Sequence, residues 1–513
     1  MSFKNRYLNK THLNPRKRYG ITYCIQLSLL IFFGFTATVL AQVEKKPNVL
    51  FIFVDDLRPE LGCYGNDLIK TPNIDKLASQ GSIFDNHYVQ VPTCGASRYS
   101  LLTGTLPSTK QHLSNEAIRT YISGKPEGKR PETFIHQLRR NGYFTVGIGK
   151  VSHYIDGLYD YQEDRENAPP ELPYSWDRNL FNAGKWKDGW DAFFAYADGS
   201  SRITMNREVK PYEKGNVDDE GYPDGLSAKL ALEQIDSLAA RKKPFFLAVG
   251  FFKPHLPFNA PKKYWDMYEE SEIPLTSSPL IPKNVNLASL HNSPEFNRYK
   301  LGEEHPVLNN PASEEYAQKI KHAYYAAVSY TDAQIGKLLD KLKNKGLDKN
   351  TIVVLWGDHG WQLGDHQVWG KHTLFEKALR SPLIIKDPML KKQKRKISKI
   401  VSSIDIYPTL MNLCAVKMPY ETKGRSMKKL LQGKSSKKWK EAAYSYFKEG
   451  MTVRVDRYRY VKYFREEEPT IELYDHKSDP YENVNIAQDN PELIKKLDKI
   501  LEKGNTGIFS NNQ

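Results

Sequence analysis

The chain has 513 residues, of which 40% are hydrophobic, and its formal net charge is +15. This composition excludes a disordered or coiled-coil protein, and the length allows one large domain with a smaller appendage. The basic balance favours an acidic partner such as a polyanionic glycan. Nucleic acid is not expected, because the sequence contains neither an arginine-rich arm nor a zinc-finger spacing.

Residues 1–41 are predicted to be a signal peptide. Basic residues without any acid precede an apolar stretch from Ile21 to Leu40, and Ala41 follows as a small residue at a plausible cleavage point. The alternative is a retained membrane anchor, although polar residues interrupt the stretch. We expect no stable membrane span after the signal is removed, and therefore a secreted or periplasmic protein.

Four continuous apolar runs predict buried strands, at residues 48–54, 143–148, 244–250 and 351–356. Helical patterns separate them, at 73–80, 133–140, 225–240 and 314–345. Strands that alternate with helices predict an α/β fold with a large, mainly parallel central sheet flanked by helices.

Two long irregular stretches, 164–191 and 264–311, are expected to line a substrate pocket. After about residue 440, short apolar runs and a last helical pattern predict a smaller C-terminal α+β subdomain with an antiparallel sheet. We therefore divide the chain into a signal peptide (1–41), a catalytic domain (45–435) and a C-terminal subdomain (440–513).

Each predicted strand ends in a group of polar residues, which are Asp55 and Asp56, Lys150 and His153, His255, and Asp358 and His359. The carboxyl ends of parallel strands meet at one edge of a sheet, where ligands bind. Carboxylate oxygens are hard ligands that suit Ca²⁺ or Mg²⁺. A single aspartate after a strand is usually a cap or a turn, but the adjacent pair together with Asp358 predicts a metal site.

The cysteines do not form a disulfide framework. Cys24 lies in the predicted signal peptide, and the remaining three (Cys63, Cys94 and Cys414) cannot all pair within one chain. Cys94 lies in the stretch PTCGASR, which begins at Pro92 and is followed by YSLLTG. This stretch resembles the motif of type I sulfatases, in which Cys or Ser, any residue, Pro or Ala, any residue and Arg precede a short helix and Thr-Gly.

Further blocks resemble the branch of that family around iduronate 2-sulfatase, namely GKVSH from Gly149, KPHLPF from Lys253 and GDHGW from Gly357. The resemblance implies an alkaline-phosphatase-like fold and a sulfatase. It implies hydrolysis of sulfate esters of a sulfated, uronic-acid-containing polysaccharide or its oligosaccharides, either a marine polysaccharide such as ulvan or a glycosaminoglycan. One departure is Ala96, where most members have Pro, so it stays open which maturation system accepts the motif.

The resemblance also assigns roles. Cys94 would be oxidised by a maturation enzyme to formylglycine (3-oxoalanine), whose hydrated gem-diol attacks sulfur. One Ca²⁺ would be held by Asp55, Asp56, Asp358, His359 and the modified Cys94. Arg98 would stabilise the deprotonated diol, and Lys150 and Lys371 would neutralise the sulfate. His255 would be the general acid, and His153 would take a proton when sulfate is released.

Three other functions compete with this one. A phosphate or phosphonate monoester hydrolase of the same superfamily would keep the fold, but most such phosphatases use Ser or Thr and zinc. A non-catalytic glycan-binding relative would be expected to lack some of the site residues, and none is missing. A glycosidase with paired carboxylates does not fit, because the acids gather around one expected metal.

Overall fold

The computed structural model describes residues 46–122, 131–159, 167–390, 392–434 and 439–509. The predicted signal peptide, residues 1–41, lies outside the described residues. From Pro47 onward the described residues belong to one compact unit. Within these ranges, no helix has both the length and the hydropathy that crossing a membrane requires. Among these residues, Cys63, Cys94 and Cys414 form no disulfide with one another.

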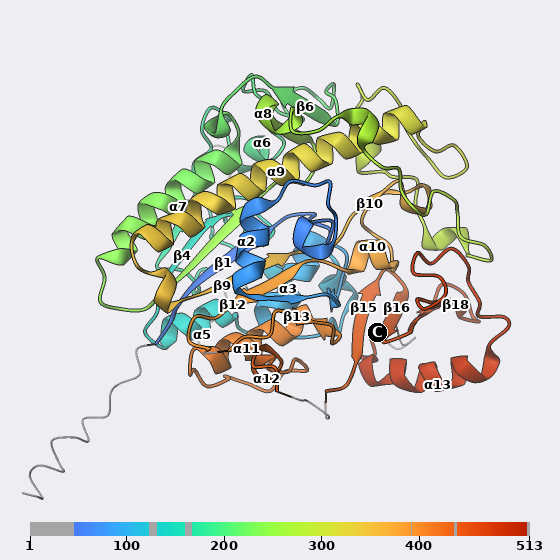
Figure 1. The fold of residues 1–513 in the computed structure, drawn as a ribbon. Coiled ribbons are helices and arrows are strands. Elements are labelled where there is room, and N and C mark those ends of the chain that lie inside the picture. The colour runs from blue at the N-terminus through green and yellow to red at the C-terminus, as the bar shows by residue number, and fades with distance from the viewer. Residues whose placement is uncertain (1–45, 123–130, 160–166, 391, 435–438, 510–513) are drawn as a thin grey trace, which may run out of the picture. The chain divides into compact units, whose positions relative to one another are not determined.

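An eight-stranded sheet forms the centre of the unit, in the order β13-β2-β12-β9-β1-β7-β4-β5 (Figure 1). β1 pairs in parallel with β7 and β9, and β4 pairs in parallel with β7 and β5, whereas β12 runs antiparallel to both of its neighbours. The sheet is therefore mainly parallel, as the sequence predicts. The strands are β1 (Asn48–Val54), β2 (Ser82–Phe84), β4 (Phe144–Gly149), β5 (Arg178–Leu180), β7 (Phe245–Phe251), β9 (Thr351–Gly357), β12 (Leu383–Lys386) and β13 (Lys396–Ile397).

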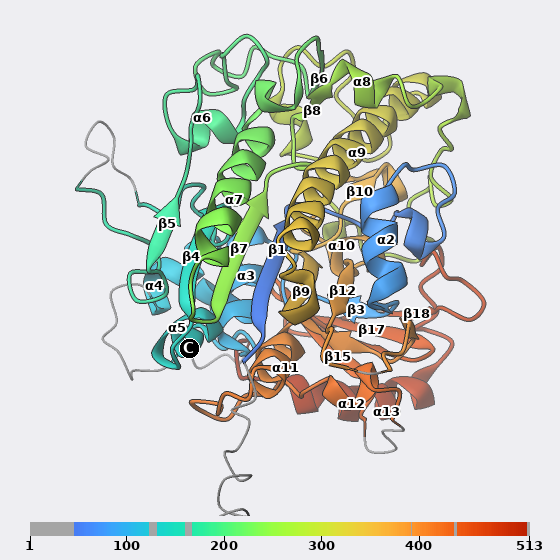
Figure 2. The ribbon, with the colours of Figure 1, turned by 60° about the vertical axis from the view of Figure 1, so that its left-hand side comes forward.

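Helices cover both faces of this sheet. Figure 2 shows α2 (Pro72–Gln80), α7 (Pro223–Ala239) and α9 (Glu314–Asn344) in front of the strands. The other face packs on α3 (Cys94–Thr103), α5 (Phe134–Arg140) and α11 (Ile406–Leu413). Alternate residues of β1 enter the two cores, Leu50, Ile52 and Val54 on one side and Val49, Phe51 and Phe53 on the other. A strand that is buried on both faces needs the continuous apolar run that the sequence has here.

Shorter elements connect these layers. They are the helices α4 (Ala117–Tyr121), α6 (Gly189–Phe193), α8 (Lys262–Trp265), α10 (Glu376–Leu379) and α12 (Lys428–Leu431), and the strands β3 (His87–Tyr88), β6 (Tyr212–Gly215), β8 (Phe258–Pro261), β10 (Gln362–Leu363), β11 (Trp369–Gly370) and β14 (Val401–Ser402). The stretches predicted to be irregular are partly ordered, since the first contains β5 and the start of α6, and the second contains the end of α8 and short 3-10 turns.

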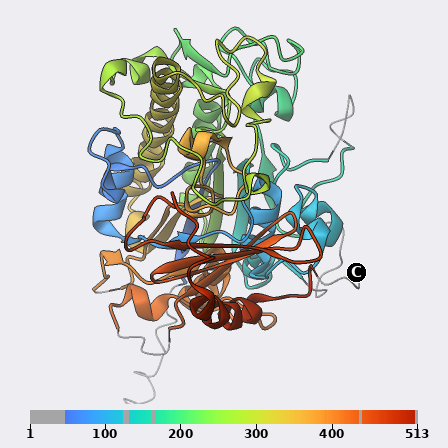
Figure 3. The ribbon, with the colours of Figure 1, turned by 90° about the vertical axis from the view of Figure 1, so that its right-hand side faces the viewer.

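The C-terminal part forms the predicted antiparallel sheet. β15 (Ala442–Phe447), β16 (Gly450–Val455), β17 (Tyr458–Tyr463) and β18 (Thr470–Asp475) pair in sequence order. α13 (Pro491–Leu501) lies along one face of this sheet (Figure 3), where Leu497 and Leu501 join Val453 and Leu473 in a separate apolar cluster. The division between the catalytic domain and this part, at residues 435–440, stays a prediction.

Hydrogen bonding between neighbouring segments continues one residue beyond the central strands. It brings the polar residues that directly follow these strands to one edge of the sheet. The amide of Asp55 donates to Phe251 O, that of Lys150 to Gly250 O and that of Asp358 to Val54 O, each at 3.2 Å. A Cβ at Gly250 would lie 2.1 Å from the carbonyl oxygen of Lys150, so only glycine permits this approach. The sheet thereby sets the positions of the chemical groups described next.

Candidate active site

Three buried carboxylates form the centre of the site. Ligand oxygens of Asp55, Asp56 and Asp358 lie within 4.8 Å of one another, and all three residues are buried. Asp56 has a φ of 57°, which is uncommon for a residue with a side chain. Two hydrogen bonds hold this conformation: the Asp56 amide donates to Asp358 Oδ1 at 3.0 Å, and the Tyr324 hydroxyl donates to Asp56 O at 2.8 Å.

Three cations match these carboxylates. Arg98 donates all five of its N–H groups, to Asp55, to Asp358 twice, and to the carbonyls of Lys150 and Val151. Lys150 Nζ lies 2.5 Å from Asp55 Oδ2. Lys371 Nζ lies 2.9 Å from Asp56 Oδ1. Buried charges need such partners, and each cation here has at least one.

The pKa values of the carboxylates differ although the groups are close. Burial raises the pKa of Asp55, but Lys150 and Arg98 outweigh it and hold that pKa well below its ordinary value. Burial raises the pKa of Asp56 well above its ordinary value, even against Lys371. The pKa of Asp358 is also raised, by burial and then by the charge of Asp55. An additional cation among these groups would stabilise the ionised carboxylates against burial and against the repulsion between Asp55 and its two neighbours.

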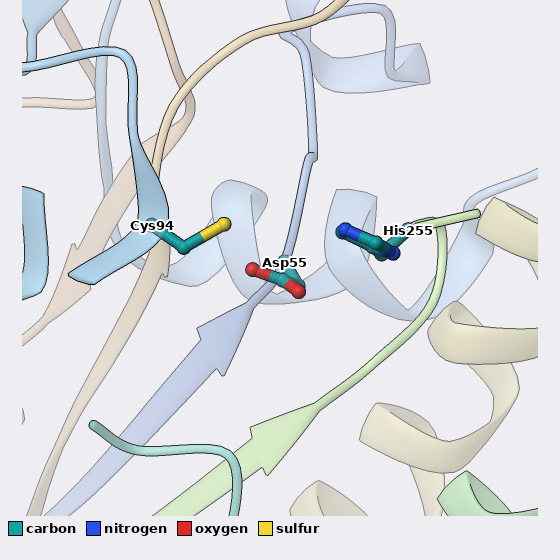
Figure 4. Close-up of side chains that lie close together, drawn as sticks. All are labelled: Asp55, Cys94 and His255. Carbon is teal, nitrogen blue, oxygen red and sulfur yellow. The ribbon is translucent and has the colours of Figure 1, made fainter. Parts of the chain in front are cut away.

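Cys94 is the first residue of α3, and its side chain faces the same space as Asp55 and His255 (Figure 4). These side chains come from a helix start, from the end of β1 and from the segment after β7. The Cys94 sulfur lies 3.3 Å from His359 Nε2 and 3.4 Å from Lys371 Nζ. Burial, followed by the charge of Asp55, raises the pKa of the Cys94 thiol to about 12, so the thiol is neutral near pH 7.

The residues present fit a hard divalent cation. His359 Nδ1 lies 2.9 Å from the carbonyl oxygen of Gly360, which only accepts, so Nδ1 carries the proton. His359 Nε2 therefore offers a lone pair, and it lies 3.3 Å from Asp56 Oδ1. The three carboxylates form one group that could hold a metal ion, and Asp56, Cys94 and His359 form another. Together the two groups contain the five residues that the sequence analysis expects as ligands.

A cavity of about 370 Å³ opens in front of these groups. It lies near the lower limit of the roughly 300–1,000 Å³ typical of ligand sites. Of the predicted residues, Cys94, Lys150, His153, His255 and Lys371 line it. The other five, which are Asp55, Asp56, Arg98, Asp358 and His359, lie behind it in one connected network of hydrogen bonds and ion pairs. The structure therefore brings all the predicted site residues together.

The two predicted proton-transfer histidines differ in their surroundings. His255 Nδ1 lies 2.7 Å from Leu256 O, and its Nε2 lies 3.0 Å from Glu295 Oε1. Burial and the charge of Lys371 lower the pKa of His255 to about 4, and Glu295 opposes this shift. His153 lines the cavity, its ring lies 5.6 Å from that of Trp190, and its Nδ1 has no hydrogen-bond partner among the described residues.

Several residues that line the cavity were not predicted individually, and they are Asn115, Trp190, Phe193, Phe194, Arg202, Glu295 and Arg298. Glu295 and Arg298 belong to the stretch 264–311, and Trp190 to the stretch 164–191, which were both expected to line a pocket. No local pattern marks these residues, because α6, which carries Trp190 and Phe193, is only five residues long, and the others lie on connections without helical or strand periodicity.

Comparison with known proteins places the chain. A family model described as Sulfatase matches residues 47–416, and one described as N-sulphoglucosamine sulphohydrolase, C-terminal, matches residues 364–506. A protein named Sulfatase from Formosa agariphila is 34% identical, with 90% of this chain and 88% of the relative covered. Human iduronate 2-sulfatase is 30% identical, with 72% of this chain and 70% of the relative covered.

The fold has solved counterparts. A phosphonate monoester hydrolase of Agrobacterium radiobacter matches with a TM-score of 0.72 at 22% identity, over 90% of this chain and 95% of its own. At this identity the likeness shows the fold alone. The family models and the two sequence relatives carry the classification: the chain belongs to the sulfatase family and is a sulfuric ester hydrolase with iduronate 2-sulfatase among its relatives.

Proposed function

We propose that this sulfatase removes sulfate from a sulfated, uronic-acid-containing glycan, either a polysaccharide such as ulvan or a glycosaminoglycan, or from oligosaccharides of these. The observation that carries the proposal is the cavity at Cys94, which lysines and arginines line. A cationic cavity binds an anionic sugar, and the chain as a whole is basic. The name of the human relative, iduronate 2-sulfatase, supports a sulfated uronic acid as substrate.

We propose that Cys94 is converted to formylglycine, which supplies an oxygen nucleophile when it is hydrated. The thiol itself is unsuited to this task, because the thiolate is the reactive form and burial keeps this thiol protonated. Ala96 lies in the first turn of α3 and is buried. A formylglycine-generating enzyme must therefore act as a partner before the chain has folded around this turn.

One Ca²⁺ ion is proposed as the cofactor, and it would be held by Asp55, Asp56, Asp358, His359 and residue 94. When bound, the ion supplies positive charge next to the reacting sulfate and the nucleophile. The protein's own part is to hold this ligand set. Arg98 does so by donating to two of the three carboxylates at once.

Lys150 and Lys371 are proposed to bind the sulfate oxygens, because both line the cavity and both flank Cys94. Fixed positive groups at the place where negative charge develops are a main source of catalysis. Arg98 is fully buried, and all its N–H groups are engaged with the protein. The geometry therefore favours a positioning role for Arg98 over a direct hydrogen bond to the nucleophile.

His255 is proposed to protonate the leaving sugar oxygen. Its Nδ1–H is held by Leu256 O, so the proton for transfer is the one that Nε2 carries in the imidazolium form, and Glu295, which faces Nε2, favours that form. His153 lines the same cavity, its Nδ1 has no hydrogen-bond partner among the described residues, and it is proposed to take a proton when sulfate is released. The aromatic side chains of Trp190, Phe193 and Phe194 line the cavity beside these histidines.

The location of the protein is also a proposal. Residues 1–41 have the charge and apolar pattern of a signal peptide, which supports a secreted or periplasmic sulfatase. The division into a catalytic domain (45–435) and a C-terminal subdomain (440–513) is supported by the separate apolar cluster of the antiparallel sheet.

One experiment tests this function. The protein is co-expressed with a maturation enzyme, the peptide that contains Cys94 is examined by mass spectrometry, and sulfate release is measured from a panel of sulfated glycans and an aryl sulfate. We expect the aldehyde at position 94 and sulfate release from uronic-acid-containing members. The Cys94→Ala variant is the control and should release none.

The same panel separates the alternatives. A phenylphosphonate monoester in the panel tests the phosphonate hydrolase, which would turn it over faster than any sulfate ester. Binding of a sulfated glycan without any release, despite a converted residue 94, would indicate a non-catalytic relative. An unmodified thiol together with no sulfate from any substrate would refute the proposed function.

A further inference from the structure

Two arginines at the cavity have no acidic partner among the described residues. Arg202 and Arg298 line the cavity that also contains Cys94. Neither forms an ion pair with any residue in the part of the chain that the structure describes, whereas the cations behind and beside Cys94 each bind a carboxylate. Arg202 is partly buried, and Arg298 is exposed at the rim. These two guanidinium groups are therefore available to a ligand.

The charges of the remaining groups are already matched. The three carboxylates behind the cavity face Arg98, Lys150 and Lys371. Glu295 is the one acidic residue among the described residues that line the cavity, and its Oε1 lies 3.0 Å from His255 Nε2 and 3.4 Å from Lys371 Nζ. Among the described residues, no second acidic side chain lines the cavity to pair with Arg202 or Arg298. A substrate whose only anion is the scissile sulfate would leave them uncompensated.

Arg202 is also held in a fixed orientation. Its guanidinium carbon lies 3.5 Å from the ring centre of Phe194 and 5.2 Å from that of Tyr299. Its Nη1 donates to the Tyr299 hydroxyl at 3.4 Å. Stacking on aromatic rings fixes the orientation of the guanidinium plane. The N–H groups that remain free can then donate a pair of parallel hydrogen bonds to two oxygens of a carboxylate or of a sulfate.

We propose that Arg202, assisted by Arg298 at the rim, binds a second acidic group of the substrate. The enzyme then selects sulfated sugars that carry two anions over those that carry one. The inference rests on the proposed function of the cavity and adds the residue that decides selectivity. A uronate carboxylate and a second sulfate ester share the required chemistry, since both are oxyanions that accept paired hydrogen bonds.

The test uses two matched pairs of substrates. One pair is a 2-O-sulfated, uronic-acid-containing disaccharide and its carboxyl methyl ester, and the other is a disulfated hexosamine and its monosulfated form. In Arg202→Gln, KM for the dianionic member should rise at least about tenfold, because a hydrogen bond to a charged group is lost. The kcat values and the KM of the monoanionic member should stay close to wild type. The pair that responds identifies the acidic group.

Three further variants make the result specific. Arg202→Lys keeps the positive charge but cannot donate the paired hydrogen bonds of a guanidinium. It should therefore retain part of the selectivity that Arg202→Gln loses. Arg298→Gln, at the exposed rim, should give a smaller loss in the same direction. Arg178→Gln is the matched control, because Arg178 lies on β5, donates to Gln234 and does not line the cavity. Thermal unfolding of each variant shows whether the fold is kept, and Arg298→Gln decides the question if Arg202→Gln does not fold.

Binding separates this inference from the proposed function. The Cys94→Ala protein, with and without Arg202→Gln, is titrated calorimetrically with both members of each pair. Absence of turnover in the wild-type enzyme with Arg202-dependent binding would refute the proposed function and keep the subsite. Equal effects of Arg202→Gln on dianionic and monoanionic sugars, or no effect on either, would overturn the subsite.

Discussion

The sulfur of Cys94 lies 3.4 Å from the ammonium nitrogen of Lys371, although 277 positions separate the two residues in the chain. Lys371 follows β11, and Cys94 begins α3 on the far face of the central sheet. The same ammonium group also binds Asp56, at 2.9 Å. Lys371 therefore joins the residue proposed as nucleophile to one of the proposed metal ligands.

Lys371→Met should lower kcat/KM by roughly 100-fold or more, because it removes a fixed positive charge at the reacting group. The measurement is sulfate release under conditions where mass spectrometry shows that residue 94 is converted. Lys377→Met is the matched control, since Lys377 lies on α10 and does not line the cavity. Equal losses in the two variants would contradict the assignment of Lys371.

Removal of the proposed Ca²⁺ ion should lower both activity and stability. Burial keeps the carboxyls of Asp56 and Asp358 at raised pKa values, and a bound cation relieves that cost. At a free Ca²⁺ concentration of 100 times the Kd, binding stabilises the fold by about 2.7 kcal/mol. Thermal unfolding with EGTA, and again after Ca²⁺ or Mg²⁺ is added back, measures the effect.

Asp358→Asn serves as the control variant, because it removes the charge of one proposed ligand. Added Ca²⁺ should raise the thermal unfolding midpoint of this variant less than that of the wild-type protein. An unfolding midpoint of the wild-type protein that is the same with EGTA and with excess Ca²⁺ would refute a calcium site at these carboxylates.

Glu295→Gln should move the alkaline limb of the pH profile of kcat/KM to lower pH. A general acid must be protonated, so activity falls as pH rises through its pKa. Glu295 raises the pKa of His255 against the lowering effects of burial and Lys371. Loss of the Glu295 charge lowers that pKa further, so deprotonation begins at a lower pH.

Glu295→Asp keeps the charge and should leave the limb closer to its wild-type position. An alkaline limb that is unchanged in Glu295→Gln, with a normal kcat at acid pH, would exclude His255 as the proton donor paired with Glu295.

Arg459→Met should destabilise the fold by roughly 3–5 kcal/mol, because it leaves buried carboxylates without their cation. Arg459, on β17, is buried and donates to Glu482 Oε1 at 2.6 Å and to Glu376. Glu376 belongs to α10, so this network joins the C-terminal sheet to the catalytic part of the unit. Urea unfolding at neutral pH measures the loss.

The pH dependence of this loss has a defined sign. Burial raises the pKa of Glu482, but Arg459 and His476 outweigh it and set that pKa at about 2. A carboxyl with a lowered folded pKa stabilises the fold above its unfolded pKa of about 4.3 and loses this contribution as the pH falls towards its folded pKa. The difference between wild type and Arg459→Met should therefore narrow below about pH 4. A difference that stays constant from neutral to acid pH would contradict the ion-pair explanation.

The sequence predicts the centre of the molecule well and its margins poorly. The four central strands lie within one residue of their predicted bounds, because each is a continuous apolar run buried on both faces. The outer strands β13, β2 and β12 on one side of the sheet and β5 at the other edge have two to four residues and are not predicted by the sequence. Such short strands depend on pairing with distant neighbours, which a local pattern does not contain.

The site divides in the same way. Residues that follow the central strands, such as Asp55 and Asp358, could be predicted because the topology of a parallel sheet requires them to meet. Glu295 and Arg202 lie on long connections without periodicity, and only the folded chain brings them to the cavity. The ion pair between Glu295 and His255 has no counterpart in any local pattern of the sequence.

The sheet edge that holds the reacting groups and the loops that complete the cavity are different parts of the chain. The floor is fixed by hydrogen bonds between strands, whereas residues such as Trp190, Arg202 and Arg298 stand on connections that the sheet does not constrain. Insertions and exchanges in these connections can accumulate without disturbing the catalytic groups. The same central sheet and catalytic groups can thus support enzymes with different sugar specificities. Redesign of this enzyme for a new glycan should therefore begin with the connections that line the cavity.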